Sequence, residues 1–280
     1  MPIVWTLRLY ISFGMLAWRR LVGVRTTFVA RAARRPHHSY RRGFATVIGP
    51  GGVEMSTPEK GLSRMTIQGV DPTAGVLPRS GMTKLILDAM TATRSNVDAL
   101  CGDREFIQSV IDAATVLIDA LRADRRVLAC GNGGSMSDAM HFAEELTGNF
   151  RSHRRPLGAL ALSDSAHLTC VGNDFGFDQV FARGVEAHGA PGDVLLAIST
   201  SGKSPNVLAA VSSAQNKGLS TIGLVGHADS PLAKAADVAV VTAVEGRWAD
   251  RVQELHIVVI HMLVELIEAA MFPARSTESR

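Results

Sequence analysis

The sequence predicts an α/β domain in which a buried parallel sheet is covered by helices on both faces. Short apolar runs alternate with helical patterns beyond residue 122, and each run stops at small or polar residues. Hydrophobic residues make up 46% of the chain and aromatic residues only 5%, which suits aliphatic helices packed on such a sheet. Strands that alternate with helices imply right-handed crossovers between parallel strands.

The individual elements follow from the hydrophobic pattern. Apolar residues recur at three- and four-residue steps from Met82 to Arg122, which predicts a helical segment before the first strand. Five strands are predicted, at 126–130, 158–162, 193–199, 220–226 and 237–244. Helices are predicted at about 135–146, within 180–189, at 205–217 and at about 250–270. Ligands of such folds bind beyond the carboxyl ends of the strands, so the residues found there are the informative ones.

Residues 1–81 differ from the rest of the chain, residues 82–280, which form the predicted folded domain. The first 53 residues hold nine arginines and no Asp, Glu or Lys, whereas the remaining 227 carry 20 basic and 26 acidic side chains. We expect residues 1–81 to be upstream sequence translated from a start codon placed too early, with Met82 as the true start. We also expect them to be largely disordered, with at most one helix near the beginning. An organelle transit peptide and a membrane-surface helix are the alternatives, because the apolar run from Leu9 to Trp18 is too short to span a bilayer.

Charge and cysteine content exclude several classes of protein. The net charge of −6 beyond residue 53 gives no electrostatic footprint for nucleic acid, and we expect neither nucleic acid nor a membrane as a partner. Cys101, Cys130 and Cys170 are odd in number and widely spaced, which argues against a disulfide framework or a CxxC metal site. The same pattern fits a reducing compartment, and we expect a cytoplasmic location.

Two predicted strand ends carry polar, glycine-containing turns that open helices. CGNGGS runs from Cys130 to Ser135, and STSGKS runs from Ser199 to Ser204 and is followed by Pro205. Glycines let backbone N–H groups approach a ligand, and a helix N-terminus adds positive partial charge. The second turn adds hydroxyls, and Ser204 followed by Pro205 is a well-formed helix start. Either turn alone could be an ordinary cap, but two such turns on one sheet predict a phosphate site.

A nucleotide site matches the same turns less well. GNGGSM supplies only the G-x-G of a dinucleotide fingerprint, since Met136 stands where the third glycine belongs. No complete G-x-x-x-x-G-K-[ST] string occurs, so the chain lacks a P-loop. The hydroxyl-rich second turn therefore favours the monophosphate of a sugar over a pyrophosphate.

Two predicted helices carry side chains that could do chemistry. His141 and Glu145 are four residues apart and therefore share one helix face. In the last helix Gln253 and His261 project roughly to one side, whereas His256 falls elsewhere. Two histidines, a carboxylate and an amide are a chemically reasonable set of zinc ligands, although each pair alone is weak evidence.

Four strings in this order and spacing resemble the phosphoheptose isomerases, which have the sugar isomerase (SIS) fold. They are CGNGGSMSDAMHFAEELTG, VGNDFGFDQVF, GDVLLAISTSGKSPNV and ADRVQELHIVVIH, and the resemblance covers about residues 82–272. It implies a three-layer αβα SIS domain with a five-stranded, flavodoxin-like parallel sheet. It also implies conversion of sedoheptulose 7-phosphate to D-glycero-D-manno-heptose 7-phosphate for bacterial heptose synthesis, by a homotetramer with one zinc ion per subunit.

The resemblance implies a role for individual residues. The catalytic acid/base pair would be Glu145 and His261, and the zinc ligands would be His141, Glu145, Gln253 and His261. The residues that contact substrate would be Asn132, Gly133, Gly134, Glu145, Asn173, Asp174, Ser199, Thr200, Ser201, Ser204 and Gln253. One departure concerns the sugar: some relatives carry Arg where this chain has Asn149, and Arg151 lies two residues further on.

An aldose–ketose isomerase moves one proton between C1 and C2 of the sugar and another between their oxygens. A carboxylate at Glu145 suits the carbon-bound proton, and an imidazole at His261 suits the oxygens, because imidazoles in general can both take up and release a proton near neutral pH. One alternative is a non-catalytic SIS scaffold that binds the bacterial replication initiator, in which the residues equivalent to these two are replaced. The other is an isomerase or etherase of a different sugar phosphate, since the sequence does not fix the length of the sugar.

Overall fold

The computed structural model describes residues 77–243 and 248–273. The chain divides into two units, Met1–Gly81 and Met82–Arg280, and almost all described residues belong to the second. The predictions made for the front end fall almost entirely outside the described residues. The exception is its last part, because helix α2 (Arg79–Gly102) begins three residues before Met82.

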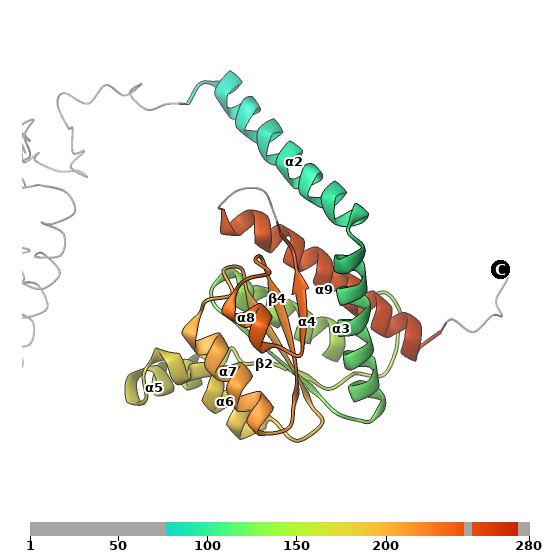
Figure 1. Cartoon of the computed structure of the whole chain (residues 1–280), viewed down its shortest axis with the longest axis vertical. Coiled ribbons are helices and arrows are strands. Elements are labelled where there is room, and N and C mark those ends of the chain that lie inside the picture. Colours follow the sequence, from blue (N-terminus) through green and yellow to red (C-terminus); the bar gives the residue numbers. More distant parts are fainter. Residues whose placement is uncertain (1–76, 244–247, 274–280) are drawn as a thin grey trace, which may run out of the picture. The chain divides into compact units, whose positions relative to one another are not determined.

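Five parallel strands form one sheet in the order β2-β1-β3-β4-β5 (Figure 1). The strands are β1 (Val127–Gly131), β2 (Ala159–Ala161), β3 (Val194–Ser199), β4 (Ser220–Val225) and β5 (Val238–Val241). Strands β1 and β3 are buried at every position, as expected for a parallel sheet covered on both faces. The predicted fold class and its flavodoxin-like strand order are confirmed.

Helices cover the sheet on both faces and complete the three layers (Figure 1). Apolar residues of α3 (Arg104–Arg122), α4 (Gly134–Thr147) and α9 (Ala249–Met271) share one buried cluster with one face of the sheet. On the other face, a second cluster joins the sheet to α5 (Ser165–Asp174), α6 (Val180–His188), α7 (Pro205–Asn216) and α8 (Pro231–Ala235). The candidate residues of α4 and α9 therefore lie in one layer.

The predicted elements differ from the observed ones at a few places. The helical segment predicted from Met82 to Arg122 consists of two helices, because the carboxylate of Asp103 accepts hydrogen bonds from the backbone of Glu105 and Phe106 and caps α3. The sequence pattern predicts no helix at α5, at α8 or at the 3-10 turn Phe177–Gln179. These elements are short, so their hydrophobic periodicity is too brief to be recognised. Among the described residues, no helix is long and apolar enough to cross a bilayer.

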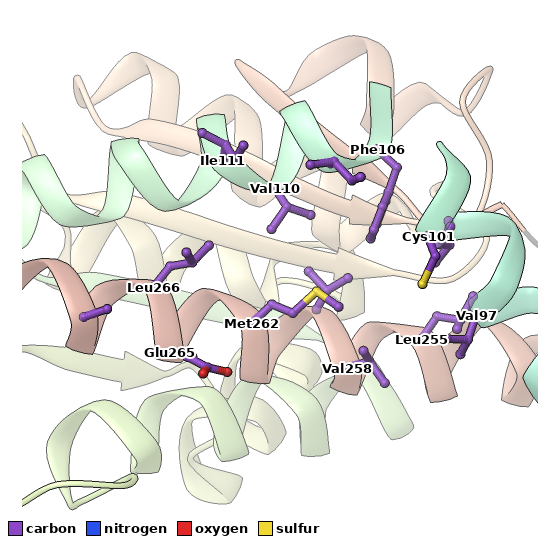
Figure 2. Close-up of a pocket in the computed structure, with 14 residues that line it drawn as sticks. Val97, Cys101, Phe106, Val110, Ile111, Leu255, Val258, Met262, Glu265 and Leu266 are labelled. Atoms are coloured by element: carbon purple, nitrogen blue, oxygen red, sulfur yellow. The ribbon is translucent and has the colours of Figure 1, made fainter. Parts of the chain in front are cut away.

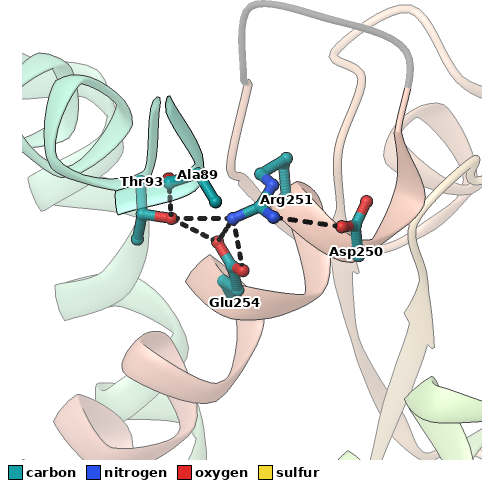
Figure 3. A network of polar contacts seen from close by, with 5 residues as sticks. All are labelled: Ala89, Thr93, Asp250, Arg251 and Glu254. Carbon is teal, nitrogen blue, oxygen red and sulfur yellow. Dashed lines mark hydrogen bonds and ion pairs between the residues drawn. The ribbon is translucent and has the colours of Figure 1, made fainter. Parts of the chain in front are cut away.

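A polar network ties α2 to the first turns of α9 (Figure 3). The guanidinium of Arg251 donates to both carboxylate oxygens of Glu254, at 2.6 and 2.9 Å, and to the hydroxyl of Thr93 at 3.0 Å. That hydroxyl donates in turn to Glu254, and Asp250 forms an ion pair with Arg251 at 3.3 Å. These contacts fix the start of the helix that carries Gln253 and His261.

Candidate active site

The two glycine-containing turns lie at the carboxyl ends of neighbouring strands, β1 and β3, and a pair of amides joins them. Asn132 follows β1 and Asn206 lies in the first turn of α7. Each side-chain nitrogen donates to the other's oxygen at 2.8 Å, and Asn206 is buried. This reciprocal contact holds the two turns in a fixed relation, so they form one site rather than two.

The turn after β3 is shaped by its own hydroxyls. The backbone of Gly202 donates to the hydroxyl of Ser199 at 3.1 Å, and that hydroxyl also lies 3.1 Å from the hydroxyl of Ser204. Gly202 has φ +62°, and a Cβ there would stand 2.3 Å from the hydroxyl oxygen of Ser230, so a side chain is excluded. Ser201 is exposed and Thr200 is half-buried, so their hydroxyls remain accessible at the rim.

The helices that open from the two turns begin without a side-chain cap. Helix α4 has Gly133 as its N-cap, with φ +55°, and α7 has Ser204. The predicted start of α7 at Ser204 and Pro205 is confirmed, but the hydroxyl of Ser204 makes no capping bond. Several first-turn N–H groups are bonded within the turns, including those of Ser135, Met136 and Val207. Because neither N-terminus is capped by the side chain of its N-cap residue, its positive partial charge still suits an external anion.

Gln253 lies against the start of α4. A Cβ at Gly134 would stand 2.2 Å from the side-chain oxygen of Gln253, so the amide occupies the space that a side chain at this position would need. The amide nitrogen of Gln253 donates to Asp138 at 3.3 Å. Asp138 is buried, and its second carboxylate oxygen has no hydrogen-bond partner among the described residues. Burial raises the pKa of Asp138, while the Gln253 bond and the neighbouring His141 act in the opposite direction.

His141, Glu145 and His261 come together between α4 and α9. The Nε2 atoms of the two histidines are 3.0 Å apart, and Nε2 of His141 lies 3.3 Å from Oε1 of Glu145. The possible ligand atoms of the three residues all lie within 4.8 Å of one another. The side chain of Glu145 is 12% exposed and that of His141 38%, so the cluster is sheltered yet reachable.

The three side chains fit a metal ion. Only one proton can lie between the two imidazole nitrogens at this distance, so one of them keeps a lone pair that could bind a metal ion. A carboxylate oxygen of Glu145 lies beside them as a further donor atom. Nitrogen and oxygen donors of this kind are the ones zinc accepts. Gln253 precedes His261 by eight residues on α9 and contacts Asp138, which precedes His141 by about one turn on α4. The Gln253 amide therefore lies on the same side of the two helices as the three clustered side chains.

An aromatic ring from the loop after α4 packs against the cluster. Phe150 stacks on the imidazole of His261, with ring centroids 6.0 Å apart and an interplanar angle of 26°. The guanidinium carbon of Arg151 lies 5.0 Å from the centroid of the Phe150 ring, and Arg151 forms an ion pair with Glu265 on α9. Asn149 is exposed, and Arg151 is engaged by Phe150 and Glu265 of its own chain.

Two predicted substrate residues are not brought into this cluster. Asn173 and Asp174 lie at the end of α5, beyond the edge strand β2, and both are exposed. Asn173 donates to Asp174 at 2.7 Å, and the thiol of Cys170 lies 3.7 Å from the same carboxylate. Within the described residues, neither side chain bonds to His141, Glu145 or His261.

His256 lies outside the cluster, as the helical spacing predicts. It is fully buried on α9, and within the described part of the chain neither ring nitrogen has a well-formed hydrogen bond. Burial lowers its pKa to about 4, and the carbonyl of Val225 at the end of β4 raises it only in part. The imidazole is therefore neutral at pH 7 and contributes to packing between α9 and β4.

Comparison with known proteins gives a consistent result. Residues 103–226 match the SIS domain family. The chain is 47% identical over 188 residues to the phosphoheptose isomerase of Aeromonas hydrophila, covering 67% of this chain and 97% of the relative. It is 52% identical over 187 residues to the phosphoheptose isomerase of Shigella dysenteriae serotype 1, with the same shares covered.

The chain belongs to the phosphoheptose isomerase family. Solved structures agree: a phosphoheptose isomerase from Neisseria gonorrhoeae superposes with a TM-score of 0.62 at 35% identity, over 67% of this chain and 99% of that one. The phosphoheptose isomerase from Francisella tularensis also gives 0.62, at 32% identity, over 66% and 97%. The resemblance found in the four sequence strings is thereby confirmed, and the chain is an isomerase.

Some residues of the site are not among those predicted from the sequence. Asp138 precedes His141 by three residues, so helical spacing alone would have placed it on the same face. Asn206 follows the proline that starts α7, and the sequence carries no signal of its contact with Asn132, 74 residues away. The stacking of Phe150 on His261 likewise depends on tertiary packing and has no local signature.

Proposed function

We propose that this chain converts sedoheptulose 7-phosphate to D-glycero-D-manno-heptose 7-phosphate through an enediol(ate), the first step of bacterial ADP- or GDP-heptose synthesis. The observation that carries the proposal is the convergence of His141, Glu145 and His261 beside two joined, glycine-containing turns that suit an anion. A phosphate group at one end and an acid/base cluster at the other are what the isomerisation of a sugar phosphate needs.

The phosphate would lie at the turn after β3. Ser199, Thr200, Ser201 and Ser204 offer hydroxyls, and the N-terminus of α7 offers the backbone N–H of Asn206. Charge-assisted hydrogen bonds to an anion are stronger than neutral ones. Gripping the phosphate in this way uses binding energy at a remote point to orient the reacting carbons. Asn132, Gly133 and Gly134, in the neighbouring turn, would face the sugar chain, together with Asn173 and Asp174 from α5.

Proton transfer would be divided between two side chains. Glu145 takes a proton from C1 of the ketose, the C1–C2 double bond of the enediol forms, and Glu145 returns a proton to C2. His261 moves the other proton between the oxygens of C2 and C1, so the aldehyde forms at C1 and a hydroxyl at C2. Phe150 holds the imidazole plane, and the low exposure of Glu145 limits competing water. Positioned proton transfer of this kind contributes about 10²–10⁴ in rate.

We propose one zinc ion per subunit, held by His141, Glu145, Gln253 and His261. When bound, zinc supplies Lewis acidity that polarises a carbonyl oxygen and stabilises negative charge on it. Glu145 has two carboxylate oxygens, so it can face the ion with one and the substrate carbon with the other. Asp138 would orient Gln253, because it accepts that residue's amide hydrogen and leaves the amide oxygen free.

We also propose that the chain is a homotetramer, as the family resemblance implies. An apolar groove of about 620 Å³ runs between α2, α3 and α9 (Figure 2). Ile107, Ile111 and Met262 line it and remain 45%, 46% and 40% exposed in the single chain. An apolar groove lined by exposed side chains favours coverage by another copy of the chain. Light scattering should give four times the mass of one chain. Cytoplasmic location and the absence of a nucleic-acid partner remain predictions.

The non-catalytic scaffold is the less favoured alternative. A scaffold has no need of a sheltered His–Glu–His cluster, yet Glu145 and His261 are both present and in contact with His141. The deciding experiment is an assay of the purified protein with a panel of ketose phosphates of about five to seven carbons. We expect aldose formation with sedoheptulose 7-phosphate and much weaker turnover of shorter sugars. Turnover of a shorter ketose alone would reassign the substrate, and no turnover of any would favour the scaffold.

A further inference from the structure

Helices α4 and α9 must keep a fixed relation for the acid/base cluster to exist. Glu145 belongs to α4 and His261 to α9, and most of the contact between the two helices is apolar, including the fully buried Phe142, Leu146 and Leu263. Apolar packing is non-directional, so it sets the distance between helices better than their register. Directional contacts are therefore the ones that decide where Glu145 stands relative to His261.

One guanidinium connects the two helices at the end of α4. The side chain of Arg154 is 1% exposed, and its Nε donates to the carboxylate of Glu268 on α9 at 2.7 Å. Its Nη2 donates to the backbone carbonyl of Glu145 at 2.6 Å, and its Nη1 to that of Leu146 at 2.9 Å. The ring of Phe272 lies 5.7 Å from the guanidinium carbon. Through these hydrogen bonds, Arg154 links the backbone of Glu145 to Glu268 on α9.

Glu268 adds a second link from the same carboxylate. Its other oxygen accepts a long hydrogen bond, 3.4 Å, from the backbone N–H of Arg151. Arg151 follows Phe150, whose ring stacks on His261. Glu268 lies seven residues, close to two turns, beyond His261 on α9, so it faces roughly the same side of the helix. One carboxylate therefore anchors both the end of α4 and the loop that carries the aromatic ring.

We propose that Arg154, held by Glu268, is a positioning residue that fixes Glu145 relative to His261. The proposal rests on the function proposed above for those two residues. The cluster lies between two directional links: Gln253 with Asp138 near the start of α4, and Arg154 with Glu268 at its end. A lysine cannot reproduce the fork of Arg154, because an ammonium can reach Glu268 or the two carbonyls but not all three.

The test is Arg154→Lys, with Arg155→Lys as a matched control. Arg155 is the adjacent residue, and it is exposed. We expect Arg154→Lys to lower kcat, per folded protein, by about 10- to 100-fold and to weaken zinc affinity by a similar factor. KM and the inhibition constant of inorganic phosphate should stay within about threefold, because the phosphate turns lie elsewhere. The control should match the wild type throughout.

A double variant separates positioning from stability. Arg154→Met with Glu268→Leu removes both buried charges, and such replacements often preserve or raise stability. If the pair serves only folding, kcat and zinc affinity should return together with the melting temperature, and that outcome would overturn the proposal. Positioning predicts a restored melting temperature with kcat and zinc affinity still low.

Failure of this proposal differs from failure of the proposed function. A wild-type protein that neither isomerises sedoheptulose 7-phosphate nor binds zinc contradicts the function, whatever the variants do. A wild-type protein that does both, with Arg154→Lys unchanged in kcat and in zinc affinity, contradicts the positioning role alone. Zinc affinity is measured by competition with a chromophoric chelator, so this readout does not depend on the choice of sugar.

Discussion

The two halves of the candidate site are built in different ways. The phosphate half consists of turns that are each continuous in sequence, and its groups are backbone N–H groups and hydroxyls of neighbouring residues. The acid/base half joins His141 to His261, which are 120 residues apart in the chain. The first half therefore depends on local backbone geometry, whereas the second depends on how α4 packs against α9. Substitutions in the two halves should consequently change different kinetic parameters.

The largest effect is expected at Glu145. Glu145→Gln keeps the size of the side chain and can still offer an oxygen to a metal, but it cannot accept the carbon-bound proton. We expect kcat to fall by at least about 10²-fold with KM little changed. Steady-state kinetics measure both parameters, and Glu144→Gln is the control because Glu144 is exposed on the same helix. A rise in KM together with a fall in kcat, or no fall in kcat at all, would break the division between the two halves.

A smaller effect on the acid/base half is expected at Gly134. In Gly134→Ala the new methyl group would occupy the space of the Gln253 amide, which lies at the end of a flexible side chain and must move away. We expect zinc affinity to weaken by about 10-fold, with little change in melting temperature. Gly102→Ala is the control, because a Cβ at that position meets nothing within 4 Å. Unchanged zinc affinity would remove Gln253 from the set of ligands.

Substitutions in the phosphate half should raise KM. Replacing Ser201 and Ser204 together by Ala removes two hydroxyls that the phosphate would use, and hydrogen bonds to a charged group are stronger than those between neutral groups. We expect KM to rise by about 10-fold or more, with kcat at saturation close to that of the wild type. Inorganic phosphate should compete with substrate in the wild type and much less in the double variant. Ser212→Ala, on the exposed side of α7, serves as the control.

The smallest effect on catalysis at neutral pH is expected at His256. Its pKa is about 4 in the folded chain and 6.5 in the unfolded one, so the unfolded state binds the proton first as pH falls. Stability is therefore lost between about pH 6.5 and pH 4, by up to about 3 kcal/mol. His256→Leu should remove this part of the pH dependence of unfolding by denaturant. An equally steep acid loss in the variant would assign the effect to other groups.

The phosphate half is more predictable from the sequence than the acid/base half, for a physical reason. Glycines, hydroxyls and the Ser204–Pro205 helix start are local signals, and the strands that carry them are recognised by their apolar runs. The three layers also follow from the alternation of strands and helices. Helices α5 and α8 are not predicted, because each is too short to show a clear hydrophobic periodicity.

The packing between α4 and α9 is not accessible to the same reasoning. Spacing places His141 with Glu145 and Gln253 with His261, but only the resemblance to known isomerases joins the two pairs. Nothing in the sequence pattern indicates that Arg154 reaches the carbonyl of Glu145 or that Glu268 holds it. Such contacts depend on the rotation of one helix against another, which hydrophobic periodicity specifies only to within part of a turn.

The central claim, that Glu145 moves the carbon-bound proton, is tested most directly by isotope exchange in heavy water. The wild type should place deuterium at C2 of the aldose product and slowly exchange the proton at C1 of the ketose, and Glu144→Gln should do the same. Glu145→Gln should lose exchange and isomerisation together, by at least about 10²-fold, while still binding the sugar phosphate. Deuterium exchange at the native rate in Glu145→Gln would show that another group is the base.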